Sequence, residues 1–182
     1  MKKRNPDYYQ QRNLNNLDRI DAMLDELPFF CEDFLRGVES RTSPLTRLNY
    51  CYDLRIFFDF LIKKKFRSKT VQDLTLEDLE SLTDTDIEIF LSYLSNYRFG
   101  EKRLSCDEHA KARKLSTIRS LFKYFFNKGL IEVNNPSKVA TPKIHEKEII
   151  RLEDNEVSSI IDTAESGSGL SGHAKGYHEQ TK

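Results

Sequence analysis

The clearest hydrophobic pattern in the chain lies between Lys111 and Lys128. Apolar residues recur there at steps of three and four, which is the spacing of one face of an α-helix. They are Leu115, Ile118, Leu121, Phe122, Phe125 and Phe126. Lysine, arginine, serine and threonine occupy most of the remaining positions. The pattern predicts an amphipathic helix that begins near Asp107 and stops at Gly129.

A second long helix is predicted from Ser43 through about Lys64. Ser43 suits the N-cap, and Pro44 suits the first helical position. The apolar face consists of Tyr50, Leu54, Phe57, Phe58 and Leu61. The opposite side carries Thr46, Asn49 and Asp53. This helix, like the first, therefore has one face for a core and one polar face.

Shorter elements precede and follow these two helices. Residues 6–25 are polar with sparse apolar positions at roughly helical spacing, which predicts an arm that packs weakly or packs on a partner. Residues 29–38 predict a short helix. Thr75 and Asp78 form a capping-box-like start of a short turn, and a further helix with an acidic outer face follows over about residues 84–97, capped by Thr83 or Asp84.

The last third of the chain has a different character. Residues 101–107 predict a polar loop, and no segment of the chain predicts a β-strand. Prolines and alternating charges predict an extended connector over residues 130–150. A helix capped near Glu153 or Asp154 is expected to run to Ala164. The last seventeen residues are Gly-rich and polar, and we expect them to lack a fixed structure on their own.

These elements predict an all-α chain in four parts. They are a helical arm over residues 1–27, a helical domain over 28–132, an interdomain linker over 133–150 and the start of a further domain over 151–182. A length of 182 residues allows one full domain and a piece of another, or two small domains. The last predicted helix has no partner domain, so we expect the chain to be truncated.

Composition narrows the class of protein. No apolar run approaches the ~20 residues of a membrane helix, and the start lacks the apolar core of a signal peptide, which favours a cytoplasmic protein without a membrane segment. Cys31, Cys51 and Cys106 are odd in number and widely spaced, which suggests reduced thiols. Cys106 and His109 have a CxxH spacing but no second ligand pair nearby, so we expect neither a metal site nor a cofactor.

A net charge of zero conceals a strong segregation of charge. Residues 41–69 carry eight Lys and Arg against two acids, and residues 102–128 carry eight against two. Residues 70–95, between them, carry seven acids and no base. Because the local field decides where a polyanion binds, two basic segments folded side by side would make a cationic face, with the acidic helix turned away.

The helix over residues 111–128 has two interpretations. Aromatic residues on one side with cations and hydroxyls on the other suit contacts to phosphates and base edges in a DNA groove. An ordinary solvated surface helix would have a similar charge pattern. The helix alone does not decide between them.

Four stretches in order resemble the N-terminal half of the tyrosine recombinases, the Xer and phage-integrase family. They are Thr46–Phe57 (T-x3-Y-x2-D-L-x2-F), Leu74–Leu79 with Thr85–Leu94, Arg113–Phe125 (r-L-S-x-I-R-x-F-y-x-f), and Gly129–Pro136 followed by Pro142-Lys143. The resemblance covers about residues 28–165. It implies a SAM-like orthogonal helical bundle, the core-binding domain, for residues 28–132.

The resemblance also implies a division of labour. The core-binding domain closes with a C-terminal catalytic domain into a clamp around double-stranded DNA, and two crossed helices enter the major groove beside the cleavage site. The catalytic tyrosine and arginines belong to the missing catalytic domain, so we expect no catalytic residue here, and Tyr177 is not the nucleophile. The full protein would break and rejoin DNA through a 3′-phosphotyrosyl intermediate, as a homo-tetramer on paired sites.

The expected DNA contacts lie on the two long helices and the connector. They are Ser43, Thr46, Arg47 and Asn49 on the first helix, His109, Lys111, Arg113, Lys114, Thr117 and Arg119 on the second, and Lys138, Thr141 and Lys143 in the connector. Asn49 could pair with adenine, and Arg113 is the best candidate for a bidentate contact to guanine. We expect Arg113 and Lys114 to share a face with Thr46 and Asn49.

Structural roles remain open for several of these residues. Arg47 could pair with an acidic neighbour, and Arg119 could brace the acidic helix or the linker. The connector cations could belong to an ordinary solvated linker. At the level of function, the alternative is a helical protein-interaction module whose acidic helix over 84–97 binds a neighbouring subunit without direct base reading.

Overall fold

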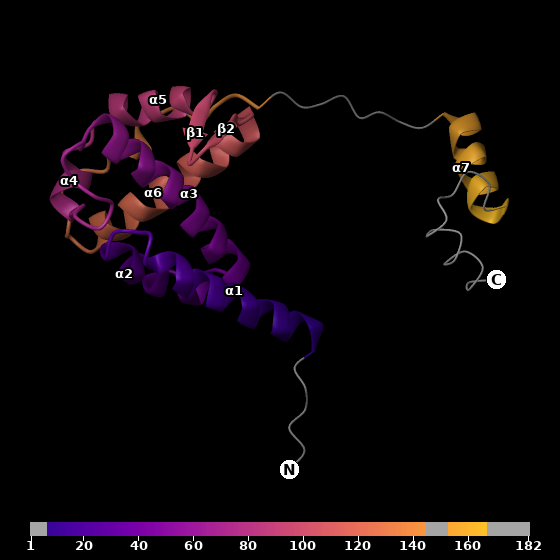
Figure 1. Cartoon of the computed structure of the whole chain (residues 1–182), viewed down its shortest axis with the longest axis horizontal. Helices are drawn as coiled ribbons and strands as arrows, with labels where there is room; N and C mark the ends of the chain where they lie inside the picture. Colours follow the sequence, from indigo (N-terminus) through magenta and orange to yellow (C-terminus); the bar gives the residue numbers. More distant parts are fainter. Residues whose placement is uncertain (1–6, 145–152, 167–182) are drawn as a thin grey trace, which may run out of the picture. The chain divides into compact units, whose positions relative to one another are not determined.

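The computed structural model describes residues 7–144 and 153–166. The chain divides into two units between Ile144 and His145, and each is described by itself (Figure 1). The first contains α1 (Tyr8–Leu24), α2 (Phe30–Gly37), α3 (Pro44–Lys64), α4 (Leu76–Glu80), α5 (Asp84–Tyr93), β1 (Tyr97–Phe99), β2 (Lys102–Leu104) and α6 (Glu108–Asn127). The second contains α7 (Asp154–Ser166). The described residues are mostly helical, and the predicted all-α class is confirmed.

Local capping signals place the helix starts where the sequence predicts them. The Ser43 side chain accepts a hydrogen bond from the Thr46 N–H, with Pro44 at the first helical position of α3. Asp107 caps α6 in the same way through the N–H of Ala110. Complete capping boxes begin α4 at Thr75 and α5 at Thr83. Each cap satisfies backbone donors that the first helical turn leaves free.

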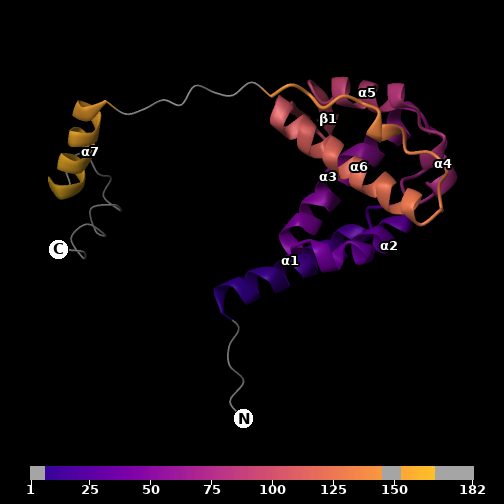
Figure 2. The ribbon, with the colours of Figure 1, turned by 180° about the vertical axis from the view of Figure 1, so that it is seen from behind.

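The core forms where α3 and α6 cross, with α2 and α5 on opposite sides of the crossing (Figures 1 and 2). Aromatic rings from all four helices meet there edge to face. The centroid of the Phe30 ring of α2 lies 5.8 Å from that of Phe58 of α3 and 5.7 Å from that of Phe125 of α6. The ring centroids of Phe57 of α3 and Phe90 of α5 are 5.1 Å apart. Fully burying such side chains contributes about 1.5–3 kcal/mol each. Burial in the core extends almost all round α3.

A small hairpin corrects the prediction that the chain has no strand. β1 and β2 pair antiparallel, and Gly100 adopts a φ of +59° in the turn between them. Tyr97 is buried, and the Arg55 guanidinium lies 4.8 Å from the centre of the Phe99 ring. Three-residue strands are too short to show an alternating pattern in the sequence, which explains why the prediction missed them.

The N-terminal arm also differs from expectation, since it packs on its own domain. Ile20 and Met23 of α1 are buried. Glu26, just beyond α1, pairs with Arg55 of α3 at 2.6 Å, and Arg19 donates a hydrogen bond to Tyr52 of α3. A thin apolar stripe is therefore sufficient for docking, because polar contacts to α3 add to it.

The first part of the connector is fastened to the domain by Arg119. Its guanidinium donates to the Pro136 carbonyl at 3.0 Å, to the Thr141 hydroxyl at 2.9 Å and to the Val139 carbonyl. Val139 is buried. The segment therefore follows the domain surface as far as Thr141.

The second unit is described only over α7 and the residue before it. Val157, Ile160 and Ile161 lie within one helical turn and are 40–54% exposed. The predicted helix is present and ends at Ser166, two residues beyond the expected end. Other predictions for residues 145–152 and 167–182, including those for Tyr177, lie outside the described residues. Within the described part of the chain, no helix is long and apolar enough to cross a membrane.

Candidate nucleic-acid interface

A buried carboxylate joins the two crossing helices. Asp53 of α3 is 1% exposed, and its Oδ1 accepts a hydrogen bond from Lys114 Nζ at 2.8 Å. Its Oδ2 accepts from Arg113 Nη1 at 2.7 Å and from the Thr117 hydroxyl at 3.0 Å. Paired and fully hydrogen-bonded, the charge can remain in the interior. These contacts set how α6 lies against α3.

One side of α6 carries a continuous row of polar side chains, here called the α6 stripe. Its members are His109, Arg113, Ser116, Ser120, Lys123 and Asn127, at alternating steps of four and three. None of the six is buried. Residues at these steps share one helix face, so the stripe runs the length of α6. Asn49 lies one turn before Asp53, on the side of α3 that meets Arg113.

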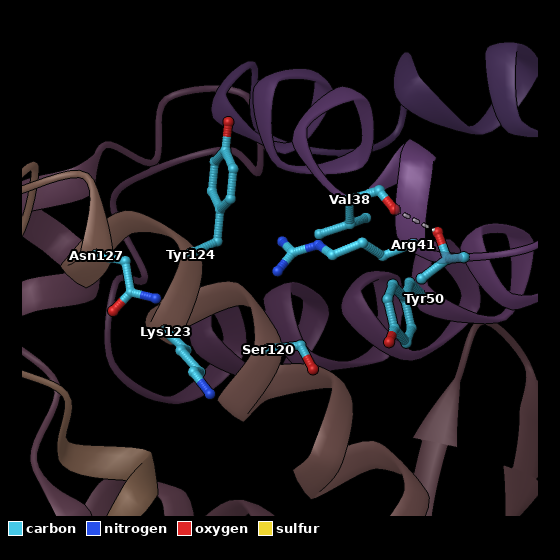
Figure 3. Close-up of a pocket in the computed structure, with 8 residues that line it drawn as sticks. Val38, Arg41, Tyr50, Ser120, Lys123, Tyr124 and Asn127 are labelled. Atoms are coloured by element: carbon cyan, nitrogen blue, oxygen red, sulfur yellow. Dashed lines mark hydrogen bonds between the residues drawn. The ribbon is translucent and has the colours of Figure 1, made fainter.

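A shallow pocket of about 270 Å³ lies along the second half of the stripe (Figure 3). Its lining consists of Val38, Arg41 and Thr42 after α2, Tyr50 of α3, and Ser120, Lys123, Tyr124 and Asn127 of α6. The lining holds two cations and several hydroxyls and no carboxylate. Small-molecule sites are larger and mostly apolar, at roughly 300–1,000 Å³. The chemistry of this pocket suits one phosphate group better than a cofactor.

The close contact of α2 with α6 beside the pocket depends on Gly37. A Cβ atom at this position would lie 2.1 Å from Cε2 of the Tyr124 ring. The absence of a side chain therefore lets the Tyr124 ring stand against α2, where it also packs on Phe34 at 5.7 Å. Tyr124 forms one wall of the pocket as a result.

Two cations that follow α3 are neutralised by the acidic segment. Beyond its C-terminal end, Lys65 pairs with Asp86 of α5 at 2.5 Å, and Lys69 pairs with Asp78 of α4 at 2.7 Å. Burial opposes ionisation of both carboxyls, but hydrogen bonds from these lysines and from threonines outweigh it, so the pKa values of Asp78 and Asp86 are lowered. The acidic segment is thus partly used to neutralise the end of α3.

In contrast, the cations around the pocket have no such partners. Arg41 and Lys123 form no ion pair with any carboxylate in the described residues. Arg113 is paired, but its side chain is still 48% exposed. Among the described residues, exposed cations without a carboxylate partner therefore remain around the pocket, as they also do at Lys64 and Arg67.

Several predicted contact residues remain at the surface. Asn49, His109 and Arg113 are exposed on α3 and α6, and Ser43 and Thr46 form the cap of α3. In the connector, Lys138 and Lys143 are exposed, and Thr141 is exposed although its hydroxyl accepts from Arg119. The structure thus leaves these residues accessible for the role predicted from the sequence.

Other predicted residues are engaged inside the domain, which corrects their assignment. Lys114 and Thr117 are 4% and 1% exposed and bind Asp53, so their polar atoms cannot reach a phosphate. Arg47 is buried against Glu39 at 2.6 Å.

Two further cations are also held within the domain. The Lys111 side chain is 13% exposed and pairs with Glu108. Arg119 braces the connector. The predicted common face of Arg113 and Lys114 is therefore reduced to Arg113.

The pocket also adds residues that were absent from the predicted set. Ser116, Ser120, Lys123 and Asn127 complete the stripe, and Arg41 and Tyr50 complete the pocket. The four on α6 could have been found from their three- and four-residue spacing from Arg113. Arg41 could not, because only the fold brings the end of α2 beside α6.

The fold and the site define a class of protein. It is a small helical bundle in which exposed cations and hydroxyls lie along one of two crossing helices. Residues 32–129, more than half of the chain, match the family model of the phage integrase N-terminal SAM-like domain. The chain belongs to this family and contains the core-binding domain of a tyrosine recombinase family protein. The predicted SAM-like fold is confirmed.

Curated relatives agree with the family. The chain is 29% identical to the tyrosine recombinase XerC of Caldanaerobacter subterraneus subsp. tengcongensis and 33% identical to XerC of Natranaerobius thermophilus. These matches cover 75% and 74% of this chain, and 40% of each relative. It is 28% identical to XerS of Streptococcus mutans, over 59% of this chain and 32% of that protein. The chain therefore spans about two fifths of these relatives, or less. A search of solved structures gave no significant match.

Proposed function

We propose that this chain is the DNA-gripping part of a site-specific tyrosine recombinase. The observation that carries the proposal is the α6 stripe, which has exposed cations and hydroxyls on a helix of the core-binding domain. Family membership supports DNA as the polyanion. The same face lacks the enclosed apolar cavity that a small-molecule substrate would need.

Each part of this face has a distinct proposed role. The α6 stripe enters the major groove, with Arg113 facing a guanine and Asn49 of α3 facing an adjacent base. Arg41 and Lys123 hold a backbone phosphate in the pocket between them. Phosphate contacts fix the register of the protein, and base contacts provide the preference for a sequence.

The activity of the full protein follows from its relatives and is also a proposal. The curated relatives are called tyrosine recombinases, and we infer that the parent protein breaks and rejoins DNA through a 3′-phosphotyrosyl intermediate. Its assembly would be a tetramer on paired sites. We assign no catalytic role to the described residues, which serve to bind and orient the duplex.

Salt dependence of binding tests the DNA-gripping role. Fluorescence anisotropy with a labelled duplex would measure affinity from about 25 to about 100 mM salt. Contact with six or so phosphates predicts a loss of roughly 10³-fold or more over this fourfold change. The control variant Lys64→Ala/Arg67→Ala lacks two exposed cations at and just beyond the end of α3. Its affinity should fall with salt as steeply as that of the wild type. Binding that stays constant with salt would reject the proposal.

A second candidate function is a protein-interaction module centred on α5. Ile89 of α5 is 52% exposed beside the acidic Glu88, so a partner helix could contact it. Contact through an apolar residue would change little with salt. Ile89→Asp would then abolish subunit association and leave DNA affinity unchanged, which separates this function from the first.

A further inference from the structure

The buried carboxylate of Asp53 has more partners than charge neutralisation requires. Lys114 is 5% exposed in its side chain and neutralises the aspartate at 2.8 Å. Thr117 adds a hydroxyl donor to Oδ2. Arg113 is different, because its side chain is 48% exposed while its Nη1 is held at 2.7 Å by the buried Oδ2. One end of the guanidinium is fixed in the interior, and about half of the side chain remains accessible.

Arg113 retains the donors that base recognition needs. Its Nη2 and Nε form no hydrogen bond with any residue in the described part of the chain, so the edge that they share is free. Two N–H groups on one edge match the O6 and N7 acceptors of guanine. A free arginine would lose rotamer freedom on binding, whereas a tethered one has lost most of it already.

We propose that Asp53 is a positioning residue for sequence recognition. It contacts no DNA itself, and it orients the Arg113 guanidinium so that the Nε–Nη2 edge faces a guanine. This inference rests on the proposed function. It adds that Asp53 fixes the orientation of Arg113, the residue that reads the base. Without Asp53, Arg113 would still attract phosphates but would lose its fixed orientation toward one base.

A test must separate positioning from stability, because a single change of Asp53 would leave Lys114 buried and unpaired. The double variant D53L/K114M replaces both charges with apolar side chains, an exchange that buried ion pairs often tolerate. Thr117 keeps a partner, since its hydroxyl also lies 3.3 Å from the Arg113 carbonyl oxygen. The variant D53N/K114M retains an acceptor oxygen for Arg113 and serves as the conservative rescue.

The probe is a duplex that the wild-type chain selects from a random pool, compared with the same duplex carrying one substituted guanine. We expect D53L/K114M and Arg113→Ala to lose about tenfold or more of this discrimination. For D53L/K114M, affinity for random DNA should stay within about twofold, since its phosphate contacts are intact. D53N/K114M should recover part of the discrimination.

Three outcomes would overturn the inference. Discrimination that survives in a cooperatively folded D53L/K114M would show that Asp53 does not orient the reading residue. Discrimination that survives in Arg113→Ala would show that another residue reads the base. Failure of the wild type to bind any duplex would instead reject the proposed function, and this inference with it.

A measurement on the wild-type protein is independent of whether the variants fold. The ¹⁵N relaxation of the Arg113 Nε–H group reports the order of the guanidinium without DNA. We expect it to be as rigid as the backbone, above an order parameter of about 0.8. An exposed arginine outside the interface, Arg67, forms no ion pair or side-chain hydrogen bond with any residue that the structure describes and provides the comparison. A mobile Arg113 would contradict the proposed positioning.

Discussion

Asp53 on α3 and Lys114 on α6 form an ion pair of 2.8 Å, in which the aspartate side chain is 1% exposed and the lysine side chain 5%. Residues 61 apart in sequence thus join the two long helices at their crossing. Removal of Lys114 would leave Oδ1 of the buried Asp53 without its hydrogen-bond donor, with the half-exposed Arg113 as the remaining cationic partner of the carboxylate.

Lys114→Met should therefore lower the free energy of unfolding by about 1–3 kcal/mol. Urea unfolding followed by circular dichroism would measure the change. D53L/K114M should recover most of the loss, since no buried charge remains. If the single and double variants are equally unstable, packing of the lysine stem rather than charge pairing is what stabilises the crossing.

Arg41→Ala combined with Lys123→Ala should weaken DNA binding alike for all sequences. Loss of one phosphate contact reduces the slope of log affinity against log salt by about 0.9, so a shared phosphate predicts a change near one and two separate phosphates near two. Anisotropy titrations at several salt concentrations would show which applies. The Lys64→Ala, Arg67→Ala control should keep the wild-type slope.

Arg119→Ala should release the connector without unfolding the domain. The guanidinium is the donor to the Pro136 and Val139 carbonyls and to Thr141, and its loss leaves these acceptors to water. Amide hydrogen exchange should quicken over residues 131–141 and remain slow in α3 and α6. If exchange quickens equally in the helices, Arg119 supports the whole core.

Helix positions were predictable because their signals are local. Ser43 with Pro44 and the cap at Asp107 fix the starts of α3 and α6, in each case through a hydrogen bond between residues three positions apart. The apolar spacing of α6 identified its core face, with the exception of Phe126, which is 44% exposed at the end of the helix. Contacts of this kind depend only on residues that are close in the sequence, so they can be predicted from the sequence.

The site was only partly predictable because its key residue depends on a distant partner. Asp53 lies opposite the main apolar face of α3, which suggested exposure. α6 covers that side, and its own cations made burial possible. Lys114 and Thr117 were assigned to DNA for the same reason, since their partner is 61 or 64 residues away. Helical periodicity identifies faces but does not show what covers them.

Acid should destabilise the protein partly through Asp78 and Asp86. The pKa values of both are lowered in the folded state, so their charged forms add stability above the unfolded pKa of about 3.9. That contribution should be lost as pH falls below about 4 through the folded pKa values. Urea midpoints from pH 6 to pH 2.5 would follow the loss, and Asp86→Asn should make the decline shallower. An unchanged profile in this variant would argue that other carboxyls cause the decline.

Gly37→Ala should disturb the pocket wall. The new Cβ would lie 2.1 Å from the Tyr124 ring, which must move, at a cost of about 1–3 kcal/mol. Thermal unfolding would measure the cost, and near-ultraviolet circular dichroism would report the displaced ring. In a Tyr124→Leu background the same substitution should cost less. Additive losses would show that the ring does not limit the approach of α2 to α6.

The contacts of Arg119 also limit how far the chain can extend. Nine residues from Val133 to Thr141 could span roughly 30 Å if fully stretched. Because these residues are held along the domain, they contribute little of that length. The effective length of the connector to any part beyond residue 141 is therefore shorter than its residue count suggests. If a part attached beyond residue 141 binds the same duplex, as the proposed function of the full protein requires, a shorter connector raises its local concentration there, so that one binding event favours the other.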